Sequence, residues 1–228
     1  MIPAYNEESS VAEVLTECLA VLPRCTGDFD VTVVDDGSTD STAAAVEAVI
    51  VKHPERVRLI RHPERRGFAE ACSTAFHAGR KDWVILLHAD GQYPPSMLPG
   101  CMHLLRSHDA ALFVRRHKYY NPVRGILSWG YRLLPRLLFR TDLKDPGGSK
   151  AIRRELIEQI PVTSTGIFRD PERILRAIKR GHRIAFLTVD ILPRKNGKAM
   201  GGRLGQATQA LKDIGSVWWQ GTIRKKQW

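Results

Sequence analysis

The fold is decided by one stretch of the sequence, Trp83-Val84-Ile85-Leu86-Leu87-His88-Ala89-Asp90-Gly91-Gln92. Its apolar residues run without alternation, which is the pattern of a strand that is buried on both faces. A buried helix segment is the competing interpretation, but Gly91 and the Pro94-Pro95 pair end the run too soon for a helix. In an open α/β sheet, ligands bind in the crevice beyond the carboxyl ends of the strands. The polar residues His88 and Asp90 are therefore candidates for a binding site.

Asp90 itself has two interpretations. A loop carboxylate in this place, with His88 as a second polar ligand two residues earlier, can hold a divalent metal against a phosphate. Alternatively, Asp90 caps the turn before a helix that begins near Pro95. The segment alone favours neither.

Upstream, strand-like and helical segments alternate. The patterns predict a short strand ending at the loop of residues 3–8, strands over 30–34 and 57–60, and helices over 11–22, from about 42, and over 67–79. This alternation predicts an α/β fold with a largely parallel sheet and right-handed crossovers.

Several of these strands end in acidic or polar loops. A crevice lined by Glu7, Asp35, Asp36 and Asp90 is costly unless it binds cations or sugar hydroxyls. The alternative is a solvated rim of loops.

Downstream, the pattern changes. A helix to about residue 107 and a strand over 110–114 are followed by an amphipathic segment, 123–140, with arginines along one side and Pro135 within it. Pro135 is expected to kink this helix or split it in two. The segment fits a membrane-surface element and a core-packing helix with a solvated basic face equally well.

The rest of the chain has a mixed pattern. Residues 145–150 are predicted to be a turn that leads directly into a short helix. A helix over 170–180, a strand-like run over 183–192 and a glycine-rich loop over 193–202 follow.

Composition restricts the class of protein. The 228 residues can build one sizeable core, and the formal net charge of +11 implies an anionic partner: nucleic acid, an acidic membrane surface or a phosphate-bearing substrate. No apolar run approaches the ~18–20 residues that cross a bilayer. The cysteines form no Cys-x-x-Cys pair, which argues against a zinc module and for free thiols in a reducing compartment. They are Cys18, Cys25, Cys72 and Cys101.

Three segments together resemble the family 2 glycosyltransferases with the GT-A fold, and specifically the dolichyl- and polyprenyl-phosphate mannosyltransferases. The segments are Pro3-Ala4-Tyr5-Asn6-Glu7, Val34-Asp35-Asp36-Gly37-Ser38 and His88-Ala89-Asp90-Gly91-Gln92-Tyr93-Pro94-Pro95. The resemblance covers almost the whole chain. It implies one GT-A domain over 1–228, a mostly parallel sheet flanked by helices with a C-terminal amphipathic, interfacial part. Residues 1–118 would be the nucleotide-sugar-binding half and residues 119–228 the acceptor-side half.

The resemblance also implies roles for single residues. The nucleoside of a nucleotide sugar, GDP-mannose or a UDP-sugar, would be held by Pro3, Tyr5, Glu7, Val34 and Asp36. His88, Ala89 and Asp90 would complete the donor site, and Asp90, Gln92 and His88 would hold Mg²⁺ or Mn²⁺. Phosphate-contacting basic residues would be Arg116, Lys150 and Arg194, and Glu172 would lie near the sugar. Asp90, Glu172 and Arg194 are the residues expected to carry the reaction.

The sequence departs from the mannosyltransferase pattern in two places. His88 stands where these enzymes usually have the first aspartate of the metal motif. Because an imidazole is a softer ligand, Mg²⁺ is expected to bind more weakly and Mn²⁺ to be preferred. In the glycine-rich loop, Lys198 comes early and Met200 occupies the place of the family's lysine.

The expected function is metal-dependent sugar transfer to a polyprenyl phosphate, by a cytoplasmic protein bound peripherally to the anionic cytoplasmic face of a membrane. A phosphate acceptor needs no general base, whereas the alternative acceptor, a soluble saccharide hydroxyl, needs one, and Glu172 or Asp170 would be the candidates. A nucleic-acid-binding module is a further alternative, suggested by the net charge and by the tail with Trp218, Trp219 and the basic run 224–226. The acidic strand ends argue against a nucleic-acid partner, since without a metal they would repel a phosphate backbone.

Overall fold

The part of the chain that the structure describes is built around seven strands, in one set of three and one set of four. The structure, a computed structural model, describes residues 1–117, 122–193 and 204–223. Within them the strands are β1 (Ile2–Ala4), β2 (Val31–Asp35), β3 (Val57–Arg61), β4 (Trp83–Leu86), β5 (Ala110–Arg115), β6 (Lys150–Arg153) and β7 (Ile184–Val189).

Two sets of strands join into one sheet. β1, β2 and β3 pair in parallel, and β4, β6, β5 and β7 follow in that order. The Met1 ammonium donates to the Ile85 carbonyl oxygen at 2.8 Å, and the Leu87 amide donates to the Met1 oxygen at 2.9 Å. This is the bonding pattern of parallel neighbours, so β1 and β4 connect the two sets. The prediction of a mostly parallel α/β sheet with the GT-A fold is confirmed.

β6 is the antiparallel member of the sheet. It pairs antiparallel with β4 and with β5, whereas β5 and β7 are parallel. The prediction of a turn leading directly into a helix was wrong here, because β6 lies between them. With Lys150 and Arg153 at its ends and only two apolar residues between, β6 has no strand pattern of its own. Its two neighbours bury it.

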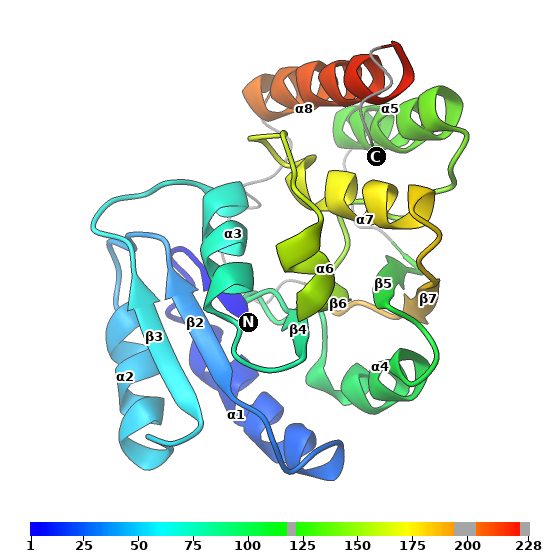
Figure 1. Cartoon of the computed structure of the whole chain (residues 1–228). Helices are drawn as coiled ribbons and strands as arrows, with labels where there is room; N and C mark the ends of the chain where they lie inside the picture. Colours follow the sequence, from blue (N-terminus) through cyan, green and yellow to red (C-terminus); the bar gives the residue numbers. More distant parts are fainter. Residues whose placement is uncertain (118–121, 194–203, 224–228) are drawn as a thin grey trace.

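Helices cover both faces of the sheet (Figure 1). They are α1 (Val11–Val21), α2 (Thr42–Lys52), α3 (Phe68–Ala78), α4 (Leu98–Leu105), α5 (Pro122–Phe139), α6 (Arg154–Gln159), α7 (Arg169–Lys179) and α8 (Leu204–Trp218). Val33 of β2 packs in the core with Val11 and Leu15 of α1, while its neighbour Val34 packs against α3 on the opposite face. β2 is therefore buried on both faces, and all five of its residues are buried.

A second apolar core lies under α7 and α8. It joins Ile152 of β6, Ile174 of α7 and Ile214 of α8, each at most 1% exposed. The sequence analysis did not predict α8, in which Gly205 and Gly215 weaken the helical pattern. Tertiary burial of Ile214 and Val217 stabilises it instead.

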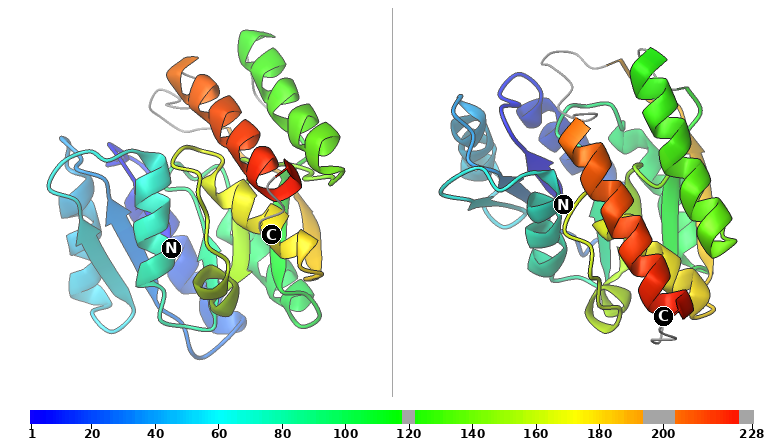
Figure 2. Two further views of the ribbon diagram at one scale, coloured as in Figure 1. Left: turned by 45° about the horizontal axis from the view of Figure 1, so that its top comes forward. Right: turned by 90° about the horizontal axis from the view of Figure 1, so that it is seen from above.

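α5 and α8 lie side by side on one end of the molecule (Figure 2). α5 runs through Pro135 as one helix, so the proline does not split it. Tyr131 packs edge-on against Phe168 and donates to the Ile167 carbonyl oxygen at 3.1 Å. Trp129 and Leu137, by contrast, remain 59% and 64% exposed, so α5 buries only part of its apolar surface. Over the three described ranges, no helix combines the length and the apolar character needed to cross a membrane.

All four cysteines are free thiols, as predicted. Cys18 and Cys101 are buried, and burial raises the pKa of each thiol to about 12. They are therefore packing residues rather than nucleophiles at neutral pH.

Candidate active site

The loops after β1 and β2 are tied into one wall at the carboxyl edge of the sheet. The Thr39 amide donates to Asn6 Oδ1 at 2.9 Å, and the Asn6 amide donates to Ser38 Oγ at 3.0 Å. The Ser41 amide likewise donates to Glu8 Oε2 at 2.9 Å. The first two sequence motifs, far apart in the chain, therefore form a single surface.

Tyr5 has an arginine over its ring. The Arg65 guanidinium carbon lies 4.2 Å from the centroid of the Tyr5 ring, a cation–π contact. Arg65 belongs to the segment 62–67, which crosses directly over Gly37. A Cβ on Gly37 would lie 2.6 Å from the Glu64 carbonyl carbon, and its φ is +69°. Only glycine fits this place, and it lets the segment 62–67 lie against the wall.

Asp36 is turned into the protein. Its side chain is 4% exposed. Oδ1 accepts from His62 Nδ1 at 2.8 Å and from the Arg66 amide at 2.9 Å, and Oδ2 accepts from the Gly67 amide at 2.7 Å. The carboxylate thus lies at the N-terminus of α3, where negative charge is favourable. This geometry leaves Oδ2 with one acceptor direction for a ligand.

Three other predicted donor-site residues are buried in the sheet. Pro3 pairs with Val34 in the β1–β2 register, Val34 is fully buried against Ala71 and Ala75, and Ala89 is 3% exposed. Glu7 lies at the start of α1, where Ser10 Oγ donates to Glu7 Oε2 at 3.2 Å.

The metal motif follows β4 at the same edge. Asp90 is 4% exposed, and its Oδ1 accepts from the Gln92 amide at 3.0 Å in a turn where Gly91 has a φ of +69°. The His88 ring packs against two aromatic rings, with centroid distances of 5.5 Å to Phe68 and 5.1 Å to Tyr93. The Leu192 amide donates to the Gln92 carbonyl oxygen at 2.9 Å, which brings the chain just before the glycine-rich loop to this motif.

These residues fit a metal that a nucleotide helps to hold. In the described part of the chain, no group of three or more His, Cys, Asp and Glu side chains is arranged to hold a metal alone. Mg²⁺, however, is usually bound through one or two carboxylates together with substrate phosphates. Asp90 would supply such a carboxylate, and the side-chain oxygen of Gln92 would be a second ligand beside it.

The predicted basic residues have different environments. Lys150 is buried, and its Nζ lies 3.6 Å from Asp170 Oδ2, while Arg173 Nη1 lies 3.7 Å from Asp170 Oδ1. Burial lowers the pKa of the Arg173 guanidinium. Arg116 is 58% exposed at its side chain and lies 3.4 Å from Asp190. Arg194, with Lys198 and Met200, lies outside the described residues.

Glu172 has a different environment from the one predicted. It is fully buried, and its carboxylate accepts from the Thr163 and Ser164 amides at 2.8–3.0 Å and from Arg176 Nε at 2.8 Å. The Thr163 hydroxyl is 3.1 Å away. The group therefore anchors the segment before α7 and presents no surface to a sugar.

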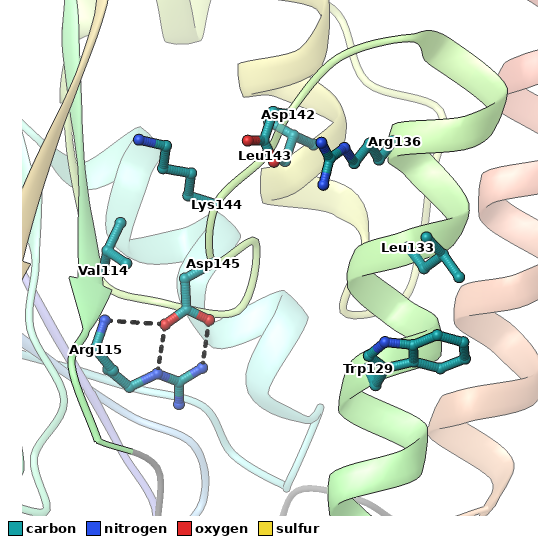
Figure 3. Close-up of a pocket in the computed structure, with 9 residues that line it drawn as sticks. All are labelled: Val114, Arg115, Trp129, Leu133, Arg136, Asp142, Leu143, Lys144 and Asp145. Atoms are coloured by element: carbon teal, nitrogen blue, oxygen red, sulfur yellow. Dashed lines mark hydrogen bonds and ion pairs between the residues drawn. The ribbon is translucent and has the colours of Figure 1, made fainter.

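A pocket of about 420 Å³ opens between β5, α5 and the loop after α5 (Figure 3). Within the pocket, Arg115 and Asp145 neutralise each other: Arg115 Nε and Nη2 each donate a hydrogen bond of 2.8 Å to the Asp145 carboxylate. The other lining residues combine apolar groups, two basic groups and one acidic group, and they are Val114, Trp129, Leu133, Arg136, Asp142, Leu143 and Lys144. With three cations against two carboxylates, the lining is positive by one charge. Such a pocket suits an amphiphilic anion.

The structure thus brings Tyr5, Asp36, His88 and Asp90 to one edge of the sheet. The sequence analysis missed His62 and Arg65, which complete this edge. The signal was present for His62, since it directly follows β3 just as Asp36 follows β2.

A mostly parallel sheet with polar loops along its carboxyl edge is the arrangement in which open α/β proteins bind ligands. The comparison with protein families makes this specific: residues 1–161, more than half of the chain, match the model described as "Glycosyl transferase family 2". The protein belongs to this family of enzymes.

Curated relatives agree with the family. Glycosyltransferase AglD of Haloferax volcanii is 31% identical, and the match covers 99% of this chain but 38% of AglD. Undecaprenyl-phosphate mannosyltransferase of Micrococcus luteus is 27% identical, with 97% of this chain and 95% of that protein covered. Polyprenol monophosphomannose synthase of Mycolicibacterium smegmatis is also 27% identical, with 94% and 85% covered.

Solved structures share the fold. Glucosyl-3-phosphoglycerate synthase from Mycobacterium tuberculosis, in complex with Mn²⁺, UDP and phosphoglyceric acid, has a TM-score of 0.75 at 21% identity, covering 95% of this chain and 76% of that chain. A complex of the same enzyme with Mg²⁺ and UDP has a TM-score of 0.72 at 20% identity, covering 95% and 77%.

Proposed function

We propose that the protein is a metal-dependent glycosyltransferase that moves a sugar from a nucleotide sugar to a polyprenyl phosphate at a membrane surface. The observation that carries the proposal is the meeting of Tyr5, Asp36 and Asp90 at one edge of the sheet, in a family 2 chain. Residues 1–118 carry the donor side and residues 119–228 the acceptor side.

On the donor side, Tyr5 and the neighbouring wall receive the nucleoside of GDP-mannose or a UDP-sugar. Asp90, with Gln92 and His88, would hold Mg²⁺ or Mn²⁺, and solved complexes of a protein with the same fold contain these ions. The bound ion neutralises charge that develops on the leaving diphosphate. Buried Lys150 is a positive group on the same sheet edge, and we assign Lys150, Arg116 and Arg194 to phosphate contacts.

The carboxylates near the acceptor side favour a phosphate acceptor over a hydroxyl. A hydroxyl acceptor needs a carboxylate that can accept its proton. Glu172 is buried and hydrogen-bonded on both oxygens, and Asp170 lies between Lys150 and Arg173. A lipid phosphate is already ionised and needs no base. The names of the relatives from Micrococcus and Mycolicibacterium support the same acceptor class.

The pocket beside α5 suits such an acceptor. Arg136 and Lys144 offer charge to a phosphate, and Trp129, Leu133 and Leu143 offer apolar surface to the first isoprene units. The pocket opens next to the exposed part of α5, which is where a lipid would leave the protein.

α5 and α8 would form the membrane-binding surface, on the cytoplasmic face of the membrane. Apolar side chains on these helices stay about half exposed or more: Trp129, Leu137, Leu211 and the adjoining Trp219. Exposed apolar groups beside basic residues bind the headgroup boundary of an anionic bilayer. Packing of α5 against the protein explains why Tyr131 and Phe139 are apolar or aromatic, but it does not explain the four exposed apolar side chains.

Transfer itself tests the proposed function. The purified protein is incubated with Mn²⁺, undecaprenyl phosphate and each of a panel of radiolabelled nucleotide sugars, and label that partitions into butanol is counted. We expect one donor to label the lipid. Label that stays in water and depends on an added saccharide would instead establish the hydroxyl-acceptor alternative.

Vesicle flotation tests the membrane surface. Leu137→Ser combined with Arg136→Glu should abolish binding to anionic vesicles, which high salt should also weaken. Val51→Ser is the matched control, since Val51 is 81% exposed on α2, far from α5 (Figure 1). If the wild-type protein does not float with anionic vesicles at low salt, the assignment of α5 and α8 as a membrane-binding surface is wrong.

A further inference from the structure

His62 lies between the donor-site wall and α3, and its side chain is 5% exposed. Its Nδ1 is 2.8 Å from Asp36 Oδ1, and its Nε2 is 3.0 Å from Thr74 Oγ1. Since an ionised carboxylate only accepts hydrogen bonds, Nδ1 donates to Asp36, and Nε2 forms the hydrogen bond with the Thr74 hydroxyl. The ring is thereby fixed in one orientation between β2 and α3.

The same carboxylate holds the segment that follows His62. Asp36 accepts from the Arg66 and Gly67 amides, so both ends of the segment 62–67 are attached to one side chain. The middle of the segment is pressed against Gly37, where no Cβ has space. Arg65, exposed at the surface, is therefore held over the Tyr5 ring by the attachment of its neighbours as well as by its own cation–π contact at 4.2 Å.

We propose that His62 is a positioning residue of the donor site: through Asp36 it holds the segment 62–67, and with it Arg65, over the face of Tyr5. This inference rests on the proposed function, because it assumes that a nucleoside diphosphate binds at Tyr5. Because the guanidinium is in direct contact with the ring, Arg65 covers one face of Tyr5 and leaves the rest of the ring to the nucleoside, and binding strength depends on how firmly the segment is held.

The test measures the binding of UDP and GDP in the presence of Mn²⁺ by titration calorimetry, alongside KM for the donor and kcat. His62→Ala should weaken nucleotide binding and raise donor KM by roughly tenfold, the loss expected for one charge-assisted hydrogen bond, while kcat changes by less than about threefold. His62→Asn keeps a donor near the Nδ1 position and should restore most of the affinity. His77→Ala is the matched control, since His77 is an exposed histidine on α3 that bonds its own helix.

Arg65→Ala provides a second route that does not disturb the interior. It should weaken nucleotide binding like His62→Ala, and because both act through one segment, the double variant should lose less than the product of the two single losses. Equal nucleotide affinity in wild type, His62→Ala and Arg65→Ala overturns the inference. So does a loss of kcat at unchanged donor KM, or a loss that His62→Asn does not reduce. If wild-type protein binds neither nucleotide, the proposed function itself fails, which is a distinct result.

Discussion

Glu172→Gln decides whether this buried carboxylate is a structural anchor or a reacting group. The new side-chain NH₂ replaces one of the two carboxylate oxygens and can only donate. In place of Oε2 it faces the Ser164 amide, and in place of Oε1 it faces Arg176 Nε, so in either orientation two donors oppose each other. Arg176, only 8% exposed at its side chain, also loses its counter-ion. Removing one partner of a buried pair costs about 3–5 kcal/mol. For a chain of 228 residues that lowers Tm by roughly 6–20 °C.

The assay combines thermal unfolding with sugar transfer measured well below Tm. We expect Tm to fall by the full amount estimated above, roughly 6–20 °C. Turnover per folded molecule should stay within about threefold of the wild-type value. Glu158→Gln is the control, since Glu158 is 66% exposed and lies 3.8 Å from Arg154 in a surface pair worth about 0–1 kcal/mol. A Glu172→Gln protein that melts like wild type but has lost turnover would refute the anchor role and restore Glu172 as a reacting group.

Three further changes test the donor edge. Asp90→Ala should lower transfer by at least about a hundredfold with cooperative melting retained, because it removes the carboxylate that would hold the metal; residual turnover at wild-type level would contradict this. His88→Asp should shift the ratio of Mg²⁺-supported to Mn²⁺-supported activity towards Mg²⁺ by supplying a harder ligand, whereas an unchanged ratio would place His88 away from the ion. Gly37→Ala should destabilise the fold by about 2–4 kcal/mol in denaturant unfolding, since the added Cβ would clash with the backbone of Glu64 at a positive φ. Unfolding at the wild-type midpoint would show that the segment 62–67 can move aside to accommodate the Cβ.

The donor half of the fold could be predicted from the sequence because its signals are local. The apolar segments before Glu7, Asp36 and Asp90 each end in turn residues of their own. Parallel strands bring their carboxyl ends to one edge, so the meeting of these loops followed from the alternation of strands and helices alone. β6 and α8 lacked such a signal, since both are stabilised by tertiary burial.

The sequence could not show which carboxylates are already occupied. The partners of Asp36 lie 26, 30 and 31 residues along the chain, and two of them are backbone amides of an irregular loop. The partners of Glu172 include amides at Thr163 and Ser164, in a segment with no helical or strand period. A motif gives the residue type at a position. Whether a carboxylate oxygen is left to accept a hydrogen bond from a ligand depends on tertiary contacts, which the motif does not include.

A crystal structure of the protein with Mn²⁺ and UDP or GDP is the most direct measurement of the central claim, that the edge formed by the loops after β1, β2 and β4 is the donor site. We predict the base against Tyr5 and next to Arg65, and the diphosphate with its ion at Asp90. Nucleotide bound elsewhere, for example in the pocket lined by Trp129 and Arg136, with the Tyr5–Asp90 edge unoccupied, would contradict the account.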